Sequence, residues 1–163
     1  MLHTWGSVGW QTQGWAAVHE CARRPEMAAF VCEIADWAIQ RQLKKNGAFL
    51  EDLSPDEPSF NSAFIAEGIA TAWALADRVG EQGRASRYAQ SWCSAAHFFS
   101  QLIIQPEDTF WMRRPAQFIG GVRPSHSRST VRIDQVSHCL HALCLGAQNL
   151  RLGPTSSSPQ PAR

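Results

Sequence analysis

Apolar side chains recur at intervals of three and four residues along most of the chain, and long alternating runs of Val, Ile and Thr are absent. This spacing is typical of amphipathic helices and gives little support for strands. We therefore predict an all-α fold. The predicted helices cover residues 13–23, 25–43, 59–79, 83–104 and 131–150.

Prolines and glycines mark the ends of these helices. Pro25 suits the first turn of a helix, and Gly47, Gly80 and Pro106 each follow or close a periodic segment. Because the connections are short, neighbouring helices are expected to form antiparallel hairpins. The segment 59–79 is apolar or small on nearly every side, which predicts a helix packed against several others.

The length of 163 residues and the 44% hydrophobic content suit one helical domain, which we assign to residues 1–152. The tail, residues 153–163, is small, polar and proline-rich, and is expected to be disordered. A long irregular stretch, residues 105–129, interrupts the helical pattern. Loops of this length in a compact domain usually lie over a functional site.

The formal net charge of +1 gives no electrostatic reason to expect nucleic acid as a partner. No apolar run approaches the roughly 20 residues of a membrane span, and the first residues lack the basic and apolar regions of a secretion signal. The five cysteines show no CxxC spacing. We expect buried free thiols in a cytoplasmic protein, with neither a bound metal nor a cofactor.

Asp134, His138 and His141 stand four and three residues apart in the last predicted helix, so they share one of its faces. A carboxylate can orient an imidazole for proton transfer, and two imidazoles with a carboxylate can also bind a metal. Apolar residues alternate with the histidines, so the same side chains are equally suited to cap or bridge neighbouring helices.

Glu67 lies on the same stripe as Phe60, Phe64 and Thr71. A carboxylate among apolar neighbours must be paired, hydrogen-bonded or protonated. Glu67 is therefore a candidate general acid. The alternative is an ion pair with an arginine from a neighbouring element.

The irregular stretch and the start of the last helix are rich in arginine, with aromatic residues between the arginines. Guanidinium groups gathered there can bind a carboxylate, sulfate or phosphate through forked hydrogen bonds. They can also be solvated, or paired with the acids Glu51, Asp52, Asp56 and Glu57. The residues concerned are Phe110, Trp111, Arg113, Arg114, Phe118, Arg123, Arg128 and Arg132.

Trp15 and His19 share a face of the first predicted helix. A tryptophan at such a position packs in a core or lines a cavity that stacks on a ring. Trp15 is therefore a second candidate for binding a ring, beside Trp111.

Three segments resemble hairpins of the α/α-toroid proteins, which include six-hairpin glycosidases, sugar epimerases and lyases, and terpenoid cyclases. The segments are QGWAAVHECAR, DWAIQRQLKKNGAFLEDLSPDEPSFNSAFIAEGIATAWALA and IGGVRPSHSRSTVRIDQVSHCLHALCLGA. The resemblance implies helical hairpins around a central cavity. The chain supplies only part of such a toroid, so we expect a homodimer or a missing partner segment to cover the exposed apolar faces.

The resemblance leaves two functional hypotheses. The first is a hydrolase, lyase or epimerase-like protein for a small saccharide, acidic or neutral, with Glu67, Asp134 and His138 as catalytic residues. The second is a noncatalytic helical binding or assembly module. A terpenoid cyclase is disfavoured because no DDxxD or DxDD run is present. The residues expected to bind the saccharide are Trp15, Trp111, Arg113, Arg123, Arg132 and His141.

Overall fold

The computed structural model describes residues 8–49 and 58–151, and this part of the chain is helical with no β-strand. The predicted all-α class is confirmed. The α-helices are α1 (Val8–Ala22), α2 (Pro25–Ile39), α3 (Asn61–Arg78), α4 (Gln82–Ser100) and α5 (Ile133–Arg151), and two short 3-10 helices are η2 (Pro106–Thr109) and η3 (Pro115–Gln117).

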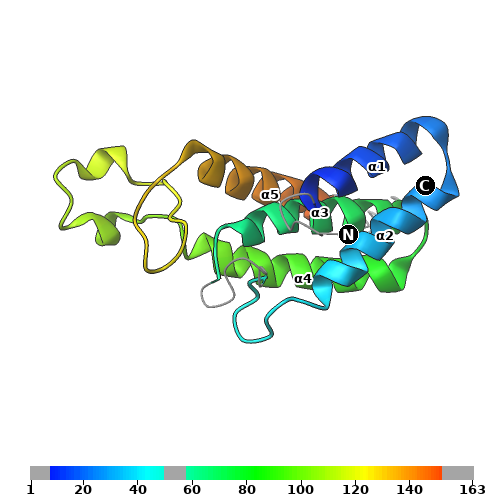
Figure 1. Ribbon diagram of the computed structural model, residues 1–163, viewed down its shortest axis with the longest axis horizontal. Helices are drawn as coiled ribbons and strands as arrows, with labels where there is room; N and C mark the ends of the chain where they lie inside the picture. Colours follow the sequence, from blue (N-terminus) through cyan, green and yellow to red (C-terminus); the bar gives the residue numbers. More distant parts are fainter. Residues whose placement is uncertain (1–7, 50–57, 152–163) are drawn as a thin grey trace, which may run out of the picture.

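Helix α3 occupies the middle of the helical assembly and contacts each of the other four α-helices. Every residue from 62 to 70 is buried. The small side chains at many of these positions let neighbouring helices approach closely on several sides, as the sequence predicted. Figure 1 shows α1 and α5 along one side of α3, with α4 along the other.

Close approach between α1 and α3 depends on two glycines. A Cβ on Gly9 would lie 2.7 Å from the carbonyl oxygen of Phe64, and a Cβ on Gly68 would lie 3.2 Å from the Cα of Gly9. Residues 8–12 thus belong to α1, whose described part begins ahead of the predicted residue 13. The spacing of apolar residues is a local pattern and could not predict this contact between α1 and α3.

The predicted ends of α2 and α4 are both too late. After Ile39 the chain turns, and Gln42 Nε2 donates to the carbonyl oxygens of Gly47 and Ser91 at 2.8 and 2.9 Å. After Ser100 the chain leaves α4, and Ile104 N–H donates to Gly121 O at 2.8 Å. Hydrogen bonds to distant segments replace the last helical turn in both places.

The buried side of α4 is tied to α2 through Asp36. The Tyr88 hydroxyl donates to Asp36 Oδ1 at 3.0 Å, and the guanidinium groups of Arg84 and Arg87 donate to the same carboxylate at 3.2 and 3.3 Å. Burial is the main reason that the pKa of Tyr88 is raised well above its ordinary value. The network satisfies the buried phenol and fixes α2 against α4.

Residues 101–132, which we call the lobe, leave the helical assembly between α4 and α5. Figure 1 shows the lobe projecting beyond the ends of the helices. Its base is closed by hydrogen bonds from Gly120 N–H to Ile104 O at 2.9 Å and from Arg123 N–H to Leu102 O at 2.9 Å. The predicted long irregular stretch is therefore an ordered projection built on short 3-10 helices.

The predicted tail, residues 153–163, and the acids at positions 51, 52, 56 and 57 lie outside the described residues. Among the described helices, none is both long enough and apolar enough to cross a membrane.

All five cysteines are free: Cys32 and Cys139 are buried, whereas Cys21, Cys93 and Cys144 are exposed. The prediction of free thiols is confirmed, but burial of all five was wrong, because three of the thiols lie on outward faces of their helices.

The thiols are expected to differ in reactivity. Burial, with a smaller contribution from the charge of Glu67, raises the pKa of Cys139 to about 12, and burial also raises the pKa of Cys32. Since the thiolate is the nucleophile, both should resist alkylation at pH 8. Iodoacetamide followed by peptide mass spectrometry should label the three exposed thiols in the native protein. Labelling of Cys139 before unfolding would contradict the buried position.

Candidate functional site

Glu67 lies at a junction of three helices, which we call the helix junction and define as Gln13, Glu67, His138 and His141. Glu67 on α3 is 1% exposed. Its Oε1 is 2.9 Å from His138 Nδ1, and its Oε2 is 3.4 Å from both His141 Nδ1 and Gln13 Nε2. Two elements far apart in sequence, α1 and α5, thus meet the same carboxylate.

Aromatic rings surround the junction. The imidazole of His138 meets the ring of Phe64 edge-to-face with 4.7 Å between centroids, and Trp10 also meets Phe64 edge-to-face, with 5.2 Å between centroids. Trp10 is 65% exposed. The junction therefore opens toward the surface on the side of α1 and α5, while Glu67 is covered.

The donor and acceptor inventory of the junction indicates how its protons are arranged. A carboxylate oxygen accepts hydrogen bonds, so His138 can donate to Glu67 from Nδ1, and Nε2 is the ring nitrogen on the side away from that contact. The side chains of His138 and His141 are 23% and 47% exposed. Glu67 can therefore fix both rings, whose outward nitrogens can exchange protons or bind a ligand.

The carboxylate of Asp134 takes another partner. Arg132 Nε and Nη2 donate to Asp134 Oδ1 and Oδ2, each at 3.0 Å. Partial burial acts to raise the pKa of Asp134, but the hydrogen bonds and charge of Arg132 outweigh it and hold the pKa below its usual value. The shared helical face was predicted from spacing alone, which could not reveal that a neighbouring arginine binds Asp134.

In the described residues, no group of three or more His, Cys, Asp or Glu side chains is arranged to hold a metal ion. Glu67 lies between the two imidazoles of α5 and contacts both. The prediction that Glu67 is a carboxylate in need of a partner is confirmed. The partners are histidines, however, and not the arginine considered as the alternative. Gln13 was missed because nothing local in α1 indicates its contact with α3.

A separate cavity of about 520 Å³ lies in the lobe. We call it the lobe pocket. Trp111 is 61% exposed, and the guanidinium groups of Arg113 and Arg114 make no hydrogen bond or ion pair within the described residues. Trp111 and Arg113 were predicted to bind the same ligand, and both residues line this pocket. The lining residues are Trp111, Met112, Arg113, Arg114, Gln117, Phe118 and Ser129.

Other predicted binding residues lie elsewhere. Arg123 donates to the carbonyl oxygen of Gln101 at 3.2 Å and lies 3.6 Å from Asp108 Oδ2, so it holds the base of the lobe. Trp15 packs edge-to-face on Phe30 of α2, with 5.9 Å between centroids. Trp15, Arg123, Arg132 and His141 are thus absent from the lining of the lobe pocket.

No protein-family model, curated protein or solved structure matches the chain. The assignment of a function therefore rests on the two clusters of side chains described above.

Proposed function

We propose that the protein is a noncatalytic binding module for a small molecule that combines a ring with an anionic group, such as an acidic saccharide. One observation carries the proposal: Trp111 and the guanidinium groups of Arg113 and Arg114 line one cavity, and the described residues of its lining include no carboxylate, imidazole or thiol. The lobe pocket has groups for recognition and lacks a pair of groups for acid-base chemistry.

Each part of such a ligand has a matching group. The indole of Trp111 and the ring of Phe118 provide flat apolar surfaces on which a sugar ring can stack. Arg113 and Arg114 are exposed, and their guanidinium groups have no partner within the described residues, so these donors remain available to a carboxylate or phosphate.

The hydrolase, lyase or epimerase-like hypothesis receives less support. Glycoside hydrolysis needs two carboxyl groups on either side of the scissile bond. Glu67 is buried between helices, and Asp134 is bound by Arg132. Neither carboxylate lines the lobe pocket. We therefore assign the helix junction a structural part in this proposal.

The experiment is isothermal titration with D-glucuronate, with D-glucose as the uncharged comparison. We expect binding of glucuronate to weaken about tenfold or more in Trp111→Ala and in the double variant Arg113→Ala/Arg114→Ala, because stacking and charge-assisted hydrogen bonds each contribute more than ~1.4 kcal/mol. Trp10→Ala removes another exposed tryptophan and should bind as the unaltered protein does.

Glu67→Gln separates binding from catalysis. Under the proposal it binds glucuronate normally, and the ligand is recovered unchanged by mass spectrometry. Conversion of a glucuronide by the unaltered protein, lost in Glu67→Gln, would establish the enzymatic hypothesis instead. Absence of heat with every acidic sugar tested would reject the ligand class.

We also propose that a second copy of the chain extends the helical hairpins in the manner of a toroid. Large apolar side chains support this proposal: Ile133 and Leu140 of α5 are 88% and 60% exposed, and Phe110 of the lobe is 89% exposed. Surfaces of this kind commonly form interfaces. Light scattering of the full chain measures the mass, and a monomer at micromolar concentration would reject the homodimer. The free thiols support a cytoplasmic location.

A further inference from the structure

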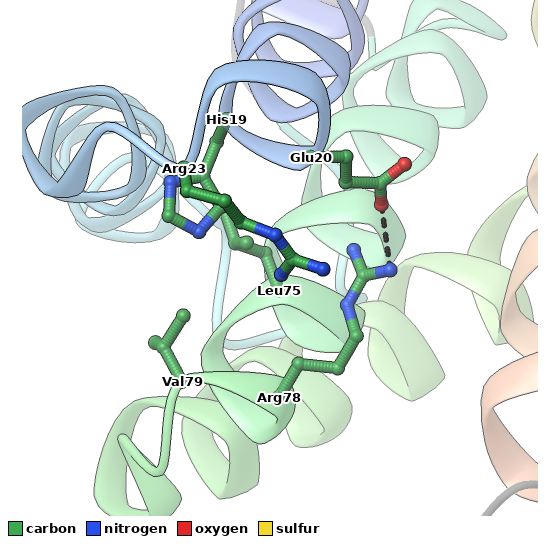
Figure 2. Close-up of a pocket in the computed structure, with 6 residues that line it drawn as sticks. All are labelled: His19, Glu20, Arg23, Leu75, Arg78 and Val79. Atoms are coloured by element: carbon green, nitrogen blue, oxygen red, sulfur yellow. Dashed lines mark ion pairs between the residues drawn. The ribbon is translucent and has the colours of Figure 1, made fainter.

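A second cavity, of about 320 Å³, lies where α1 turns into α2 beside the end of α3. We call it the turn cavity. Figure 2 shows the guanidinium groups of Arg23 and Arg78 pointing toward each other across it. Leu75 and Val79 add an apolar part to the wall. The lining residues are His19, Glu20, Arg23, Leu75, Arg78 and Val79.

The charges of the turn cavity do not balance. Glu20 forms an ion pair with Arg78, with 2.6 Å between Oε1 and Nη1. The guanidinium group of Arg23 has no hydrogen bond or ion pair within the described residues. Two guanidinium groups thus face one carboxylate, which leaves one positive charge in the cavity.

His19 can add a third donor. Its Nδ1 lies 2.8 Å from the carbonyl oxygen of Arg24, which only accepts, so Nδ1 carries a proton. With Nδ1 directed at that carbonyl oxygen, Nε2 is the ring nitrogen that remains to face a bound anion. An imidazole and two guanidinium groups on a cavity wall are a common donor set for phosphate.

The backbone of Arg23 supplies an independent observation. Its φ is +53°, and among the described residues it is the one non-glycine residue with positive φ. Arg23 N–H donates to His19 O at 2.8 Å, which is the helix-ending position that usually holds glycine. A side chain at this position strains the backbone, and such strain is commonly found at functional sites. Here the strained residue is the one whose guanidinium group enters the cavity unpaired.

We propose that the turn cavity binds the phosphate group of a small organic phosphate, with Arg23 and Arg78 as its guanidinium ligands and His19 as a further donor. Leu75 and Val79 contact the carbon part of the molecule. This site is separate from the lobe pocket and does not rest on the proposed function.

The test uses Arg23→Gly and follows the melting temperature with millimolar glycerol 3-phosphate, against glycerol and sodium chloride at the same ionic strength. Without ligand, Arg23→Gly should melt about 2–4 °C higher than the unaltered protein, because glycine removes the backbone strain. With glycerol 3-phosphate the unaltered protein should be stabilised, and Arg23→Gly should lose that stabilisation. A gain in stability together with a loss of binding distinguishes a ligand site from a structural arginine.

Arg24→Ala is the matched control. Arg24 lies in the same turn but pairs with Glu26 outside the cavity lining, so this variant should keep the full response to glycerol 3-phosphate. The double variant Arg113→Ala/Arg114→Ala should also keep it. The proposal is overturned if the unaltered protein shows no response, if Arg23→Gly responds as the unaltered protein does, or if Arg24→Ala loses the response equally.

Discussion

Gly47→Ala should lower the free energy of unfolding by about 2–4 kcal/mol, because an alanine there meets both backbone strain and a fixed backbone atom. The φ of Gly47 is +79°, and a Cβ would lie 2.2 Å from the carbonyl oxygen of Ser94. That oxygen belongs to α4 and cannot move without disturbing the helix. Urea denaturation monitored by tryptophan fluorescence measures the change.

Gly80→Ala is the control for this result. The φ of Gly80 is +83°, nearly the same, but nothing lies within 4 Å of the position of its Cβ. Only the backbone strain remains, so a loss of about 1 kcal/mol is expected. Equal losses of stability in the two variants would show that the turn containing Gly47 does not approach Ser94 of α4 closely enough to exclude a Cβ.

Glu67→Ala should lower the free energy of unfolding by about 2–4 kcal/mol, because it removes a buried carboxylate that two imidazoles and an amide contact across three helices. Glu67→Gln keeps the shape and one acceptor, so a loss of about 1 kcal/mol is expected. The same urea titration provides both values.

Glu33→Ala makes the same chemical change at an exposed position of α2. It should alter stability by less than about 0.5 kcal/mol. If Glu67→Ala were no more harmful than Glu33→Ala, the carboxylate would not hold α1 and α5 to α3, and its contacts with the histidines would need another explanation, such as a part in chemistry.

Helices could be predicted from the sequence because their signals are local. Pro25 begins α2, Gly80 follows α3, and the segment 62–70, apolar or small except for Glu67, is buried as its composition indicates. Residues 8–12 were not predicted to be part of α1, and Gly9 among them contacts Gly68, which lies on a different helix. Local patterns cannot contain such contacts.

In the candidate sites, too, local patterns predicted some features, whereas contacts between distant residues could not be predicted. Apolar neighbours revealed that Glu67 would be buried and would need partners, and helical spacing placed His138 and His141 together. Neither pattern could show that Asp134 accepts hydrogen bonds from Arg132, or that Arg123 donates to the carbonyl oxygen of Gln101 at the base of the lobe. The conformation of Arg23 could not be foreseen, since no local pattern indicates positive φ at an arginine.

The lobe has a consequence for how this protein can change during evolution. It leaves the helices after α4, returns before α5, and is joined at its base by hydrogen bonds between main-chain groups of residues 102, 104, 120, 121 and 123. Such bonds depend little on side-chain identity. Substitutions at Trp111, Arg113 and Arg114 can therefore accumulate without weakening the helical core, so under the proposed function the choice of ligand could change while the scaffold stays the same.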